Sequence, residues 1–271
     1  MSGGCPHQPK SDFLSDRANG GSMKFFDVNT FIGMPTCRMY GALKDAEGLL
    51  ASMKVSGISE AVVWHISQQD GFPLDGNLLL SEEIRGKKCL CGCWTILPPQ
   101  TREVVSKGFF KRMKKDGIFF LRAFPAKHNY LLNAAVFGDF FEELSERKVP
   151  LMLSLERGVS WDNIYSLMSE FPKLTCIVCD IGVWGQDRRL WPLLEKYRNL
   201  MVETSLLSLG EFMLEATVEE FGAERIVFGT GFPSHAHQAA MLQLVHAEIS
   251  EKDKQKIASR NIERVIGRIS L

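Results

Sequence analysis

The chain has no excess charge of either sign, because its 271 residues carry 32 Lys and Arg against 32 Asp and Glu. This balance argues against the broad basic surface typical of nucleic-acid-binding domains, so we expect no nucleic-acid partner. No apolar run approaches the roughly 18 residues of a membrane span, and residues 1–22 hold no apolar segment of signal-peptide length. We therefore expect a cytoplasmic protein without a membrane partner.

Cysteine is scarce and odd in number, with seven in the chain. A chain of this size without a signal peptide is expected to keep its cysteines as reduced thiols. Cys89, Cys91 and Cys93 alternate and so share one face of a strand, where small buried residues are favoured over ligands for a soft metal. Cys176 and Cys179 point to opposite faces of a strand, which argues against a redox pair.

A dinucleotide-binding glycine pattern is also missing, because Gly33 follows the first apolar run without the other glycines of GxGxxG. The chain instead alternates short apolar runs with longer helix-periodic stretches. The runs are Lys24–Asn29, Glu60–Ile66, Cys89–Leu97, Ile118–Phe124, Leu151–Leu155, Leu174–Asp180, Leu200–Thr204 and Arg225–Thr230. Eight such units predict the α/β class and a single (β/α)8 TIM barrel over residues 23–271, preceded by a flexible tail over residues 1–22. An open doubly wound sheet is the alternative.

Six segments, in order along the chain, resemble a known family. They are Asp27–Gly33, Pro150–Ser154, Phe171–Gly182, Asn199–Ser205, Phe221–Pro233 and Asn261–Gly267. Together they are similar to the amidohydrolase-related branch of the amidohydrolase superfamily, the metal-dependent hydrolases built on a TIM barrel. The resemblance implies a hydrolase that cleaves C–N, C–O or C–C bonds, with metal ligands at the carboxyl ends of its strands.

The positions at which the resemblance implies metal ligands hold other residues. Asn29 and Phe31 stand at the two histidine positions of the first strand, Ser154 at that of the fifth, and Asp180 at that of the sixth. Gly231 stands where the family's proton-handling Asp is expected. Phe and Gly offer no side-chain ligand, and Asn and Ser are weak ligands for zinc. We therefore expect no metal site of the family type and no cofactor.

Ligands of a TIM barrel approach the carboxyl ends of the strands, so polar residues there are the candidate site. His65, Asp180 and Glu203 are the predicted catalytic residues, because imidazole and carboxyl groups in a desolvated site can transfer protons. The predicted substrate-binding residues are Asn29, Arg122, Glu156, Ser205, His235 and His237. Each also has a structural alternative, such as a rim histidine or a salt bridge between Arg122 and Asp180. His235 and His237 do not suit a shared metal, because residues two apart on a helix point away from each other.

Two functions of different class follow. The main reading is an amidohydrolase-related pseudoenzyme that binds a small, carboxylated molecule without a metal or without catalysis. The alternative is an active hydrolase or lyase acting on a small carboxylated or ring substrate by proton transfer from His, Asp or Glu. A weaker alternative is a scaffold protein whose pocket is closed by Phe31, Trp184 and Phe232. The resemblance suggests a homo-oligomer and leaves open whether the protein is an enzyme.

Overall fold

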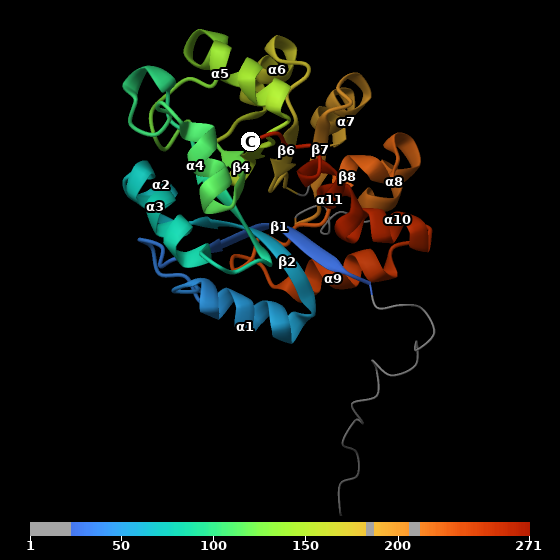
Figure 1. Cartoon of the computed structure of the whole chain (residues 1–271). Helices are drawn as coiled ribbons and strands as arrows, with labels where there is room; N and C mark the ends of the chain where they lie inside the picture. The colour runs from blue at the N-terminus through green and yellow to red at the C-terminus, as the bar shows by residue number, and fades with distance from the viewer. Residues whose placement is uncertain (1–22, 183–186, 206–211) are drawn as a thin grey trace, which may run out of the picture.

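Eight parallel strands form one sheet in the order in which they occur along the chain, β1-β2-β3-β4-β5-β6-β7-β8 (Figure 1). The computed structural model describes residues 23–182, 187–205 and 212–271. The strands are β1 (Phe25–Ile32), β2 (Ile58–His65), β3 (Leu90–Thr95), β4 (Ile118–Arg122), β5 (Leu151–Ser154), β6 (Cys176–Cys179), β7 (Leu200–Glu203) and β8 (Ile226–Val227). The predicted tail over residues 1–22 and Trp184 lie outside the described residues.

Backbone hydrogen bonds join the first strand to the segment of the last. Val28 N donates to Phe228 O at 2.9 Å, and Phe31 N donates to Phe232 O at 3.0 Å. Thr30 and Phe232 form a parallel bridge between the same segments. The predicted (β/α)8 TIM barrel is therefore confirmed, and the open doubly wound sheet is excluded.

Helices fill every connection between consecutive strands and surround the sheet (Figure 1). They are α1 (Ala46–Ser56), α2 (Ser67–Asp70), α3 (Pro73–Ile84), α4 (Phe109–Asp116), α5 (Ala134–Arg147), α6 (Trp161–Glu170), α7 (Asp187–Lys196), α8 (Met213–Phe221), α9 (His237–His246), α10 (Glu251–Gln255) and α11 (Asn261–Ile266). Short 3-10 turns are η1 (Pro99–Thr101), η2 (Leu155–Arg157) and η4 (Ala223–Arg225), and η5 (Lys256–Arg260) is a π-helical turn. No described helix is long and apolar enough to cross a membrane.

Side-chain caps set where several helices begin. Asp45 accepts from Gly48 N ahead of α1, and Asn133 accepts from Val136 N ahead of α5. Ser160 forms a capping box with Asn163 ahead of α6. Each cap satisfies an amide that the first helical turn leaves without a partner, which fixes the exit of the chain from the strand before it.

The apolar core has two parts, one inside the barrel and one between the sheet and the helices. Phe120, Met152 and Ile177 belong to the inner part, while the alternate residues of their strands face the helices. Cys93 is buried in the inner part and Cys91 packs against it. Cys89 instead precedes β3 and packs against the outer part, so the prediction that all three cysteines share one face is wrong for this residue. Burial raises the pKa of both the Cys91 and the Cys93 thiol to about 12, which leaves them protonated and unreactive.

Candidate active site

Six polar side chains converge in the barrel toward the carboxyl ends of the strands, and all are buried. They come from β1, β4, β5, β7 and the residues that follow β6 and β7. The six are Asn29, Arg122, Ser154, Asp180, Glu203 and Ser205. We call this set the mouth network. The structure thus brings together five of the nine predicted site residues and adds Ser154.

Asn29 is the centre of the mouth network. Its Nδ2 donates to Asp180 Oδ1 at 2.8 Å and lies 3.4 Å from Glu203 Oε1. Its Oδ1 accepts from Arg122 Nη2 at 2.8 Å. The Asn29 amide therefore connects the guanidinium to both carboxyl groups. Arg122 and Asp180 form no direct ion pair among the described residues, because Asn29 hydrogen-bonds to each of them.

Asp180 and Glu203 are held by donors on several sides. Asp180 N donates to Glu203 Oε1 at 2.8 Å, and Ser205 N donates to Glu203 Oε2 at 2.7 Å. The Ser205 hydroxyl is 2.6 Å from Glu203 Oε1, and the Ser154 hydroxyl donates to Asp180 Oδ2. Asp180 has a left-handed backbone with φ of 54°, which is uncommon for a residue other than glycine. In this backbone conformation the Asp180 N–H points toward the Glu203 carboxyl group.

Glu203 is a buried carboxyl group with a raised pKa. Burial, and next the charge of Asp180, raise the pKa of Glu203 to about 8. The mouth network holds two carboxyl groups and one guanidinium, so one proton on the pair makes its formal charge zero. This raised pKa favours the protonated form of Glu203 at neutral pH, from which the group can donate a proton.

Arg122 has unused hydrogen-bonding capacity. Its side chain is 1% exposed, and its guanidinium stacks on the Trp64 ring at 5.0 Å from the ring centroid. Neither Nε nor Nη1 has a hydrogen-bond partner among the described residues. Since arginine stays charged in proteins, these two buried N–H groups are donors that a ligand acceptor could satisfy.

Arg157 is a second guanidinium beside Trp64, and it is not among the site residues predicted from the sequence. It stacks over Phe31 at 4.8 Å and over Trp64 at 5.1 Å. It also donates to Gln69 Oε1 at 3.2 Å. Burial, and next the charge of Arg122, lower the pKa of Arg157. Its position just after the carboxyl end of β5, next to the predicted site residue Glu156, is a signal in the sequence that points to Arg157 as well.

His65 ends β2 beside the first loop. Its Nδ1 accepts from Ser67 N at 3.1 Å, so the neutral ring carries its proton on Nε2. Burial lowers the pKa of His65, which keeps the ring neutral at pH 7. A Cβ at Gly33, where φ is +92°, would lie 2.7 Å from the ring, so the absence of a side chain at Gly33 makes room for the imidazole.

Glu156 and His235 lie on the solvent side of the mouth network. Glu156 is exposed, and burial, followed by the charge of Asp180, raises its pKa, while the nearby His235 acts in the opposite direction. A Cβ at Gly231 would be 2.8 Å from His235 Cδ2 and 3.6 Å from Asp180 Oδ1. The position at which the resemblance implies an Asp therefore adjoins the mouth network.

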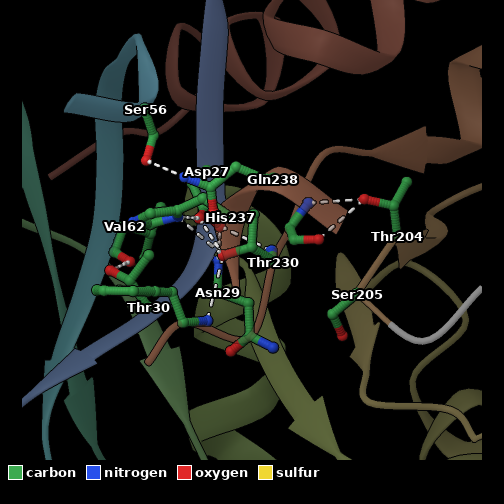
Figure 2. A network of polar contacts seen from close by, with 12 residues as sticks. Asp27, Asn29, Thr30, Ser56, Val62, Thr204, Ser205, Thr230, His237 and Gln238 are labelled. Carbon is green, nitrogen blue, oxygen red and sulfur yellow. Dashed lines mark hydrogen bonds and ion pairs between the residues drawn. The ribbon is translucent and has the colours of Figure 1, made fainter. Parts of the chain in front are cut away.

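His237 belongs to a different group of contacts, which joins β1 to the segment after β8 (Figure 2). Its Nδ1 is 3.4 Å from both Asp27 Oδ2 and Thr230 Oγ1, and its ring stacks on Phe232 at 3.8 Å. Thr230 donates its hydroxyl to Asp27 and its amide to Asp27 Oδ1 at 3.0 Å. These contacts give His237 a role in closing the barrel, and its predicted role in substrate binding stays a prediction.

Residues 97–268 match the sequence pattern of the family described as Amidohydrolase. The chain belongs to the amidohydrolase family. No curated protein is significantly similar to it in sequence. Within residues 23–182, 187–205 and 212–271, no group of three or more His, Cys, Asp or Glu is placed to hold a metal ion.

Solved structures similar to this chain include two decarboxylases and a hydrolase. The 5-carboxyvanillate decarboxylase of Sphingomonas paucimobilis is 15% identical over 92% of this chain and 100% of its own, with a TM-score of 0.72. The 2,6-dihydroxybenzoate decarboxylase of Rhizobium is 16% identical over 90% and 99%, with a TM-score of 0.68. A putative 2-pyrone-4,6-dicarboxylic acid hydrolase of Pseudomonas putida is 18% identical over 91% and 98%, with a TM-score of 0.68. At these identities the likeness establishes the barrel fold.

Proposed function

We propose that this amidohydrolase-family barrel binds a small carboxylated or ring compound at the carboxyl end of its sheet and acts on it as a lyase or hydrolase. The observation that carries the proposal is the pair of buried Arg122 donors, Nε and Nη1, without partners among the described residues. A guanidinium presents its N–H groups as a planar fork that matches a carboxylate. A carboxylate of the ligand would satisfy both donors, each of which costs about 1–3 kcal/mol when buried and unpaired.

Proton transfer would come from the side chains around Arg122. Loss of CO2 breaks a C–C bond and leaves its electron pair on carbon, which then takes up a proton; hydrolysis also requires a proton for the leaving group. Glu203, with its pKa near 8, and His65, with its proton on Nε2, are the donors we assign. Carboxylated compounds named for the similar decarboxylases and hydrolase agree with this substrate class.

We also propose that the barrel works without the metal that its family implies. Asn29 uses Oδ1 to accept from Arg122 and directs its Nδ2 at Asp180, so its oxygen does not face the acidic group. Ser154 donates its hydroxyl to Asp180. A divalent cation needs converging lone pairs, whereas here N–H and O–H groups converge on the carboxyl oxygens and a guanidinium lies nearby. These residues do not fit the family's metal.

A ligand-binding barrel without catalysis is the second candidate. Both Glu203 oxygens accept hydrogen bonds from the protein, which favours a fixed structural group over one that exchanges protons with a ligand. The two candidates share the carboxylate site at Arg122 and differ in turnover. Binding without product would therefore select the second candidate.

The test uses the full chain after treatment with a chelator and measurement of its metal content. Calorimetric titration with 2,6-dihydroxybenzoate and with 2-pyrone-4,6-dicarboxylate measures binding, and chromatography of the mixtures measures product. We expect Arg122→Met to weaken binding by about tenfold or more, since it removes charged hydrogen bonds. Arg188→Met, at an exposed position of α7, is the matched control and should bind like the natural chain.

Two results would contradict the proposal. If Arg122→Met binds both carboxylates as tightly as the natural chain, the site is not at Arg122. If the purified chain holds stoichiometric zinc and loses turnover when the zinc is removed, the barrel has a working metal centre.

A further inference from the structure

A pocket of about 220 Å³ lies at the amino-terminal end of the barrel, opposite the mouth network. Its walls come from the residues that precede β5, β6, β7 and β8 and from the end of α11. The lining residues are Lys148, Lys173, Thr175, Arg198, Asn199, Met201, Glu224, Arg264, Val265 and Arg268. We call it the basal pocket. Met201 also packs in the inner core, so the pocket reaches the floor of the barrel.

The basal pocket concentrates positive charge in a chain whose formal net charge is zero. Five cations line it against one carboxylate, Glu224. That carboxylate is already paired with Lys256 at 2.7 Å. None of the five lining cations forms an ion pair within the described part of the chain, and Arg264 donates only to the neutral acceptors Glu224 O and Asn261 Oδ1.

Helix carboxyl termini account for part of this charge. α5, α6, α7 and α8 all end at this side of the barrel, and each terminus carries about half a negative charge. Arg147 and Lys196 already lie in the last turns of α5 and α7. The positive charges of Arg147 and Lys196 already offset the partial negative charge of the four helix ends. The five cations that line the pocket are therefore an excess of positive charge.

Arg225 is a further cation that contacts the chain next to the lining residues Arg198 and Asn199. It donates to Leu194 O at 2.9 Å and, through Nε, to Leu200 O at 3.1 Å, so its contacts are with neutral carbonyls. Burial, and next the charge of Arg198, lower the pKa of Arg225. Arg225 therefore adds a positive charge beside Arg198, since the carbonyls that it contacts flank Arg198 in the sequence.

We propose that the basal pocket binds a small oxyanion that carries two or more negative charges. Guanidinium forks from Arg198, Arg264 and Arg268 match the oxygens of phosphate or carboxylate groups, while Lys148 and Lys173 contribute point charges. Thr175 and Asn199 supply polar side chains among them. The site is separate from the mouth network, because the two share no residue and most of the pocket lining precedes β5, β6, β7 or β8, whereas the mouth network lies toward the carboxyl ends of the strands.

The test is calorimetric titration of the full chain with pyrophosphate and with citrate at low ionic strength. We expect saturable binding with stoichiometry near one per chain. The double variant Lys173→Gln and Arg268→Gln should weaken binding by about tenfold or more, because each lost charged contact weakens the complex. Both residues are exposed and make no ion pair with described residues, so the variant is expected to fold, which its circular dichroism would verify.

Lys44→Gln with Lys107→Gln is the matched control, since it removes the same charge from exposed positions outside the pocket. Its binding should stay within about twofold of the natural chain. Equal losses in the two double variants would show a general charge effect and would overturn the proposal. Absence of saturable binding to either anion by the natural chain would overturn it as well. If pyrophosphate binds and citrate does not compete, the site is assigned to phosphate groups; if both bind, it accepts either oxyanion.

Discussion

Asn29 Nδ2 donates to Asp180 Oδ1 across 2.8 Å, joining β1 to the residue that follows β6. Through its Oδ1 the same amide accepts from Arg122. Replacement by alanine leaves a buried guanidinium and a buried carboxylate without their shared partner. We expect Asn29→Ala to lower the free energy of unfolding by about 2–4 kcal/mol. Urea denaturation followed by circular dichroism measures this.

Asn199→Ala is the control for that change. Asn199 is half-buried and donates a single hydrogen bond to Pro172 O at 3.2 Å, so its loss should cost less than about 1 kcal/mol. Equal costs for the two variants would mean that Asn29 does not hold the mouth network together.

The pKa of Glu203 makes stability depend on pH. A carboxyl group whose pKa is near 8 in the folded chain and about 4.3 in the unfolded chain favours folding when protonated. Its contribution is full below about pH 4 and is lost as the pH rises toward 8. We expect the free energy of unfolding of the natural chain to fall by several kcal/mol between about pH 5 and pH 8, relative to that of Glu203→Gln. Urea titrations of both chains at each pH measure the difference, and a difference that is independent of pH would contradict a raised pKa at Glu203.

Gly229 leaves room for the Glu203 carboxyl group. A Cβ at this position would lie 2.3 Å from Glu203 Oε2, closer than atoms can approach. We expect Gly229→Ala to cost about 1–3 kcal/mol of stability through overpacking. The same change should cost less when Glu203 is alanine, because Oε2 and Cδ, the two closest atoms, are gone and only Cβ at 3.1 Å remains. Strictly additive costs in this double-mutant cycle would place the strain elsewhere.

Thr230 connects the two segments that close the barrel. Its hydroxyl donates to Asp27 and accepts from Phe232 N at 3.1 Å (Figure 2). Thr230→Val keeps the shape and removes both contacts, so we expect a loss of about 1–3 kcal/mol in thermal or urea unfolding. Thr36→Val, at an exposed position, should change stability by less than about 0.5 kcal/mol. A loss at Thr230 no larger than that at Thr36 would show that barrel closure does not depend on this hydroxyl.

The strands were predictable because their apolar runs are continuous, and each predicted run overlaps an observed strand. Boundaries were less predictable. The eighth strand shortens from Arg225–Thr230 to Ile226–Val227, and the first extends from Asn29 to Ile32. The ends of these two strands depend on which backbone N–H and C=O groups form hydrogen bonds between β1 and the segment of β8. Local periodicity carries no information about hydrogen-bond partners that are so distant in the chain.

The amino-acid sequence was sufficient to define the alternation of strands and helices, the family resemblance and the polar residues at the strand ends, since each depends on residue type and spacing along the chain. Only the tertiary structure decided that Asn29 lies between Arg122 and Asp180, that His237 instead contacts Asp27 at the barrel seam, and that Arg157 shares Trp64 with Arg122. Hydrogen-bond partners and burial are set by side chains from distant strands meeting in space. The raised pKa of Glu203 follows from the same cause, because it reflects burial and the neighbouring Asp180.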